Sequence, residues 1–104
     1  MIADRPVRLR SRIHLQRLAE LRCTIPGCTG WPVDPHHLTF VQPRARGLKA
    51  SDELTVPLCR YRHHSAASRF GVHHSGDERG WWMVMGIDPE PIAARLWAES
   101  ETPF

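Results

Sequence analysis

The sequence predicts a single small domain of the α+β class, and three observations lead to that prediction. A chain of 104 residues that is 41% hydrophobic is long enough for one limited core and too apolar to be disordered. Two short segments typical of strands lie between segments typical of helices. Six of the seven histidines occur as adjacent pairs, and three cysteines cannot all pair as disulfides, so metal ligation is expected. Together these observations predict a zinc-stabilised domain with flanking helices.

Within this one compact domain, the chain divides into three expected parts. Residues 1–22 form a basic arm and helix, residues 23–76 contain the metal-binding core, and residues 77–104 form a helical extension. The longest apolar run is only a few residues, and the N-terminal segment has no apolar signal region. We therefore expect a cytoplasmic protein without membrane contact, in a reducing compartment that favours metal-bound cysteines.

The positive charge is concentrated in the first part of the chain. Residues 1–63 carry eleven Lys and Arg against five acids, whereas residues 64–104 carry three against six. Every cation except Lys49 is an arginine, and the planar guanidinium makes bidentate contacts to phosphate. This asymmetry predicts an anionic partner such as DNA on one side of the protein; a solvated basic surface is the alternative.

The first expected element after the basic arm is a helix over about residues 12–22, with Ser11 as its N-cap. The apolar residues expected near one face of this helix are Ile13, Leu18 and Leu21. Strands are expected over about residues 30–40 and 54–58, and the second strand leads into Cys59. The loop between the strands is basic and suits phosphate contacts, with a merely solvated loop as the alternative.

Three further helices are expected after the second strand. Their expected bounds are about 59–70, 77–86 and 89–100. Gly71 and Gly86 would end the first two of these helices, because glycine adopts the left-handed conformation that often follows a helix. Asp88 and Pro89 suit the N-cap and the first position of the last helix. A turn that contains the third histidine pair is expected just beyond Gly71.

Three cysteines and one histidine are expected to form a structural zinc site. Cys23 and Cys28 flank a Pro-Gly turn, so the chain folds back and brings the two sulfurs together. Cys59 supplies a third sulfur, and His63, four residues later, can supply a nitrogen from the first turn of a helix. Such a closed site has no open position and only stabilises the fold. A pair of buried free cysteines is the alternative for the first two ligands.

The remaining histidine pairs predict a second metal site that stays open to a substrate. If one member of each pair binds a divalent ion, water completes the shell, and the ion can polarise a phosphate. Adjacent residues at the end of a strand point to opposite faces, so one imidazole can hold the ion while its neighbour acts as a general base. The histidines available for this second site are His36, His37, His64, His73 and His74.

The order of these motifs resembles the HNH, or ββα-metal, endonucleases. The chain has a two-cysteine turn, a strand ending in His-His, a basic loop and the strand TVPLC followed by His-His. The later motifs His-x-x-Gly-Asp-Glu, Trp-Trp and Gly-Ile-Asp-Pro resemble small phage and prophage HNH proteins related to a phage recombination enhancement nuclease. The resemblance covers about residues 20–98. It implies a metal-dependent hydrolase of DNA phosphodiester bonds in recombination or DNA processing, and it suggests a strand-exchange protein as a further partner.

The resemblance also implies a role for each histidine. His36 and His64 would bind a catalytic divalent ion such as Mg²⁺ or Mn²⁺, and His37 would be the general base. His73 best matches the last metal ligand, with His74 as its rival. The structural zinc ligands it implies are Cys23, Cys28, Cys59 and His63. The side chains expected to contact DNA are Arg44, Arg46, Lys49, Arg60 and Arg62.

The chain departs from the family pattern in ways that leave other functions open. The last zinc ligand follows Cys59 by four residues, whereas many members have it after three. The asparagine that gives HNH its middle letter is absent, which leaves Asp52 or Thr55 to orient the base. A second hypothesis is therefore a non-catalytic zinc-stabilised module that binds DNA as an accessory to recombination. A structural or assembly protein of a phage is the third.

Overall fold

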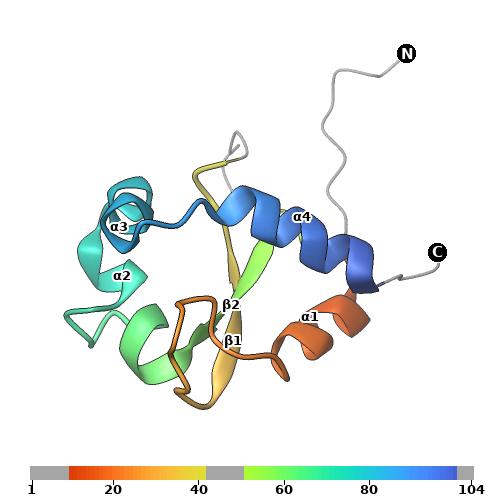
Figure 1. The fold of residues 1–104 in the computed structure, drawn as a ribbon, viewed down its shortest axis with the longest axis horizontal. Helices are drawn as coiled ribbons and strands as arrows, with labels where there is room; N and C mark the ends of the chain where they lie inside the picture. Colours follow the sequence, from red (N-terminus) through yellow and green to blue (C-terminus); the bar gives the residue numbers. More distant parts are fainter. Residues whose placement is uncertain (1–9, 42–50, 101–104) are drawn as a thin grey trace.

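The computed structural model describes residues 10–41 and 51–100, with a two-stranded antiparallel sheet at its centre (Figure 1). Strand β1 runs over Val33–His37 and strand β2 over Thr55–Cys59. This sheet and the surrounding helices confirm the expected α+β class, although the first strand is shorter than expected. None of the helices within the described ranges combines the length and hydrophobicity required to cross a bilayer.

Every residue of strand β2 is buried. Its carbonyl at Pro57 accepts two hydrogen bonds from Thr24, from the backbone N–H at 2.9 Å and from the side-chain hydroxyl at 2.7 Å. On the other side, Pro57 faces Pro35 of strand β1 in the ladder. The segment that follows the first helix therefore runs along β2 and holds the first cysteine beside it.

Helix α1 spans Arg12–Leu18, so it is four residues shorter than expected. The expected N-cap is confirmed, because the hydroxyl of Ser11 accepts a hydrogen bond from the backbone N–H of His14 at 3.1 Å. The expected apolar face is wrong in one position: Ile13 is exposed, whereas His14 and Leu18 are fully buried. Residues 14 and 18 are four apart and share a helix face, so the buried stripe includes a histidine.

The single helix expected after β2 is wrong beyond His64. The chain instead forms a five-residue π-helix, η1, over Arg60–His64, and then irregular turns up to Gly71. A short helix, α2, follows over Val72–Ser75 in place of the expected turn. Gly71 does not end a helix: it caps the start of α2, and a Cβ at this position would overlap the carbonyl oxygen of Ser65. The glycine is required by this close approach.

The last two helices lie where they were expected. Helix α3 covers Glu78–Met85 and ends at Gly86, whose φ is +71°; helix α4 covers Pro89–Ser100. Helix α4 lies beside α1, while α2 and α3 lie together at the other end of the molecule (Figure 1). The buried core includes both tryptophans of α3. The buried residues of this core include Leu38, Val56, Leu58, Val72, Trp81, Trp82 and Ala93.

Candidate metal centres

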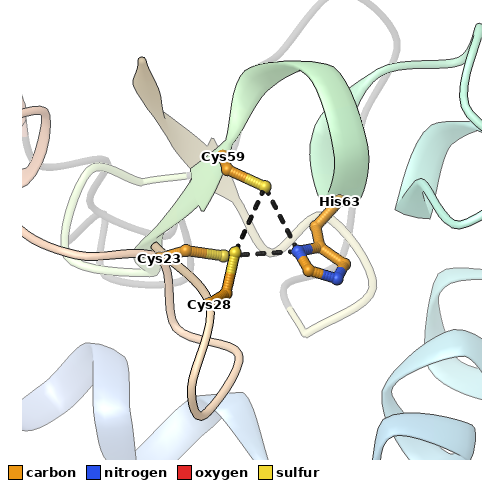
Figure 2. A group of neighbouring side chains, drawn as sticks. All are labelled: Cys23, Cys28, Cys59 and His63. Atoms are coloured by element: carbon orange, nitrogen blue, oxygen red, sulfur yellow. Dashed lines mark hydrogen bonds between the residues drawn. The ribbon is translucent and has the colours of Figure 1, made fainter. Parts of the chain in front are cut away.

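Four side chains from distant parts of the chain meet at the end of β2: Cys23, Cys28, Cys59 and His63 (Figure 2). The Nδ1 atom of His63 lies 3.2 Å from the sulfur of Cys59 and 3.6 Å from that of Cys23. The sulfurs of Cys28 and Cys59 are 3.7 Å apart. Zn–S and Zn–N bonds of about 2.3 and 2.1 Å in a tetrahedron would separate these atoms by about 3.5 to 3.8 Å. This cluster, which we call the cysteine cluster, can therefore hold a metal ion such as zinc.

Local structure presents each ligand of the cysteine cluster. Cys28 closes a turn in which Gly27 has a φ of +78°, and its backbone N–H donates to the carbonyl of Ile25 at 3.1 Å. Gly30 must be small, because a Cβ there would lie 2.8 Å from the Cβ of Cys59. Because Cys59 ends β2 and the histidine ligand lies on η1, one ion would tie the turn, the sheet and the π-helix together.

Burial shifts the pKa values of two members of the cysteine cluster, Cys23 and His63, in opposite directions. It raises the pKa of the Cys23 thiol to about 12, whereas burial and the charge of Arg62 lower the pKa of His63. The imidazole is therefore neutral at neutral pH, which is the form that binds metals. The buried thiol requires a nearby positive charge to ionise, and a divalent ion supplies that charge. The donor set therefore suits a bound metal ion.

A second group, which we call the histidine cluster, consists of His36, His64 and His73. These residues come from β1, η1 and α2, so three separate elements contribute one imidazole each. The Nε2 atoms of His64 and His73 are 3.2 Å apart. Two nitrogens on one ion at bonds of about 2.1 Å would be about 3.0 to 3.4 Å apart. His36 is buried and His73 is exposed, so the cluster is open on one side only.

The environment keeps His64 neutral. Burial lowers its pKa, and the two neighbouring histidines lower it further, although Asp34 acts in the opposite direction. The Nδ1 atom of His64 lies 3.2 Å from a carboxylate oxygen of Asp34, which leaves Nε2 directed at His73. The rival ligand His74 stands apart, because its Nδ1 lies 3.1 Å from the carbonyl oxygen of Ala66. Of the pair His73-His74, it is therefore His73 that lies in the histidine cluster.

His37 lies outside the histidine cluster and contacts Asp52 instead. Its Nε2 is 2.8 Å from Oδ1 of Asp52, whose other oxygen accepts the backbone N–H of Ser11 at 2.7 Å. Burial opposes ionisation of Asp52, but the hydrogen bonds from His37 and Ser11 lower its pKa overall. Of the two residues expected to orient the base, Asp52 makes the contact. The hydroxyl of Thr55 is buried and has no hydrogen-bond partner within the described residues.

Sequence reasoning did not assign a role to two carboxylates beside the histidine cluster. Asp34 contacts His64, and Glu78 contacts His36 with its Oε2 atom 2.7 Å from Nε2 of the ring. Asp34 stands two residues before His36, so it lies on the same side of β1, a signal that strand periodicity offers. Glu78 belongs to the Gly-Asp-Glu motif, but its contact spans 42 residues and depends on how α3 packs.

The residues expected to contact DNA are only partly described. Arg44, Arg46 and Lys49 lie outside the described residues. The guanidinium of Arg60 is held by Asp34 through contacts of 2.9 and 3.1 Å, so this side chain is engaged with the protein itself. The guanidinium of Arg62 lies 4.7 Å from the ring centre of Phe70, and both residues are exposed.

Comparisons with protein-family models, curated proteins and solved structures found no match to this chain. The interpretation of the two clusters therefore rests on their own residues and geometry. The cysteine cluster offers a complete set of four ligands, which suits a structural ion. The histidine cluster offers three, which leaves positions for water or a substrate oxygen.

Proposed function

We propose that this protein is a metal-dependent DNA endonuclease of the HNH, or ββα-metal, type. The observation that carries the proposal is the pair His36-His37 at the end of β1. One member lies in the open histidine cluster, and the other is held by a buried carboxylate. A metal-dependent hydrolase needs a bound electrophilic ion and a general base, and this pair would supply a ligand for the ion and the base from adjacent positions.

The order of elements supports the proposal. Two antiparallel strands are followed directly by a helical segment, and the histidine cluster draws its ligands from the first strand and from the helices after the second. The π-helix and α2 take the place of the single helix that the family resemblance implies. Each of these two pieces carries one residue of the histidine cluster, which supports the proposal of a ββα-type metal site.

In the proposed reaction, His37 removes a proton from the attacking water. Its Nε2 faces Asp52, so Nδ1 is the nitrogen that accepts the proton. Asp52 holds the ring in one orientation and stabilises the imidazolium that forms. A divalent ion such as Mg²⁺ or Mn²⁺ on His36, His64 and His73 would stabilise the phosphate charge and the leaving oxygen. The products would carry a 5′-phosphate and a 3′-hydroxyl.

The cysteine cluster has a separate, supporting role in this proposal. Its ligand His63 immediately precedes His64, and both lie on the five residues of η1. A zinc ion on the cysteine cluster would fix this π-helix to the sheet and thereby hold His64 in place. Chelation of the zinc would then abolish cleavage even though the zinc takes no part in the chemistry.

The proposal is tested by cleavage of supercoiled plasmid and of single-stranded DNA with Mg²⁺, Mn²⁺ or EDTA. We expect metal-dependent nicking by the parent, and no nicking by His37→Ala with unchanged zinc content. His74→Ala is the matched control, because it removes an imidazole that lies outside both clusters. If His37→Ala cleaves as fast as the parent, the mechanism is wrong.

Binding of DNA without cleavage under every condition would instead favour the zinc-stabilised accessory module. That binding would weaken steeply with salt, because it would depend on phosphate contacts. If the protein retards no DNA in a gel at low salt, the third hypothesis, a structural or assembly protein, is favoured.

A further inference from the structure

We propose that Glu78 is a positioning residue of the histidine cluster, which fixes the tautomer and orientation of His36 so that Nδ1 is the nitrogen offered to an ion. The inference rests on the proposed function only in taking the histidine cluster to be a metal site. It assigns part of that site to helix α3, in the segment that sequence reasoning treated as a helical extension.

Three donors surround the Glu78 carboxylate. Its Oε2 atom lies 2.7 Å from Nε2 of His36 and accepts the indole N–H of Trp82 at 3.0 Å. Its Oε1 atom accepts the hydroxyl of Thr39 at 3.3 Å. The Glu78 side chain is 13% exposed and that of His36 is 3% exposed, so water competes little for these contacts.

The contact determines which nitrogen of His36 carries the proton. A carboxylate only accepts hydrogen bonds, so the ring donates from Nε2 and keeps its lone pair on Nδ1. A lone pair is what a metal ion requires. The carboxylate also strengthens the metal ligand, because a charged hydrogen-bond partner increases the electron density on the nitrogen that would bind the ion. An uncharged side chain in place of Glu78 would strengthen the His36 ligand less.

A second histidine of the cluster shows the same arrangement with the nitrogens reversed. Asp34 takes Nδ1 of His64 at 3.2 Å, and the Nε2 atom that remains lies 3.2 Å from Nε2 of His73. Two of the three imidazoles are therefore each held by one carboxylate on one nitrogen. A side chain that merely filled space would not produce this pairing at both positions.

Helix α3 holds Glu78 rigidly. Asp77 caps the helix by accepting the backbone N–H of Gly80 at 3.1 Å, which makes Glu78 the first helical residue. Trp82 lies one turn later and is 2% exposed in the core. Its indole contact with the carboxylate therefore links the buried core to His36. The His36 ring therefore contacts a Glu78 carboxylate that Trp82 and Thr39 also hold in place.

Metal titration tests the inference without an activity assay. Protein loaded with one equivalent of Zn²⁺ is titrated with Co²⁺, whose visible bands distinguish nitrogen ligands from the thiolates of the cysteine cluster. We expect Glu78→Gln to weaken binding at the histidine cluster by about 10- to 100-fold, the usual effect of losing an outer carboxylate. The zinc content should remain that of the parent.

Two variants serve as controls. Glu90→Gln removes the same charge from the first turn of α4, where the side chain is exposed, and should leave Co²⁺ affinity unchanged. Thr39→Val removes one donor to Glu78 but keeps its charge, so we expect a smaller loss than with Glu78→Gln. If charge at a helix start were all that mattered, Glu78→Gln and Glu90→Gln would behave alike.

A second measurement needs no variant. Nitrogen NMR of the parent, with zinc bound and no second ion, reports the tautomer of each histidine. We expect His36 to carry its proton on Nε2. A proton on Nδ1, or parent-like Co²⁺ affinity in Glu78→Gln, would overturn the inference and leave the metal site standing. No Co²⁺ binding to the histidine cluster of the parent would instead count against the proposed function.

Discussion

Replacing His63 by alanine tests how far the cysteine cluster holds this fold together. The imidazole is 6% exposed and lies against the sulfurs of Cys23 and Cys59. Structural zinc contributes about 10–16 kcal/mol in small domains, so an equal share for each of four ligands is about 2.5–4 kcal/mol. The cavity left by a buried ring adds about 1–2 kcal/mol. The expected loss is about 3.5–6 kcal/mol, against a typical net stability of about 5–15 kcal/mol.

Thermal unfolding followed by circular dichroism measures this loss. A destabilisation of about 4 kcal/mol lowers the melting temperature of a domain of this size by at least about 15 °C. We expect the parent to contain zinc and, with a chelator, to melt at a lower temperature than His63→Ala does without one. The variant keeps three cysteine ligands, so it should also respond to the chelator, but by less than the parent because it has less metal-binding energy to lose.

His74→Ala is the control for this experiment, because it removes an exposed imidazole outside both clusters. Its stability should remain within about 0.5 kcal/mol of the parent. The reasoning is refuted if His63→Ala has the same melting temperature as the parent, or if the chelator leaves the melting temperature of the parent unchanged. Either result would mean that packing alone stabilises the turn, the sheet and η1.

Three further predictions follow from contacts described above. Asp52→Asn keeps the shape of the side chain but removes the charge beside His37, so single-turnover cleavage should fall by about 10²- to 10⁴-fold with unchanged zinc content; an unchanged rate would remove Asp52 from the mechanism. Gly71→Ala places a methyl group on the Ser65 carbonyl, so denaturant unfolding should show a loss of about 1–3 kcal/mol. It should also weaken metal binding at His73 more than at the cysteine cluster, and equal effects on both would contradict this account. Burial, with Arg17 nearby, lowers the pKa of His14 below 6.5, so the unfolded chain binds more protons as the pH falls through 6.5 and stability declines there. Chemical denaturation at about pH 7.5 and 5.5 should show a smaller decline for His14→Gln than for the parent, and equal declines would exclude His14 as the cause.

Sequence patterns predicted the residues whose neighbours in the chain determine their structure. Ser11 and Gly86 act as caps within one turn of the helices they begin or end, so local spacing was sufficient. The cysteine cluster was predictable because the chain has three cysteines, and His63 follows the last of them by four residues, about one helical turn. Its members do come together in space.

The features that sequence did not predict depend on contacts between distant segments. The helix expected over 59–70 fails at Ser65, because the backbone there must pass against Gly71, and local propensity contains no sign of that approach. His14 is buried in place of Ile13 because α4 packs on that face of α1, where His14 and Trp97 rings are 4.8 Å apart. Glu78 reaches His36 only through the packing of α3.

The π-helix η1 affects how many residues can separate Cys59 from His63, two members of the cysteine cluster. In η1 the backbone N–H of Ser65 bonds to the carbonyl of Arg60, five residues earlier, at 3.0 Å. Such a turn contains one residue more than an α-helical turn. The histidine of the cysteine cluster, His63, lies in this wider turn, and the next residue, His64, belongs to the histidine cluster. A single additional residue between Cys59 and His64 can thus be absorbed as a wider helical turn. Such an insertion would change the diameter of η1 and leave the residues of both clusters in register.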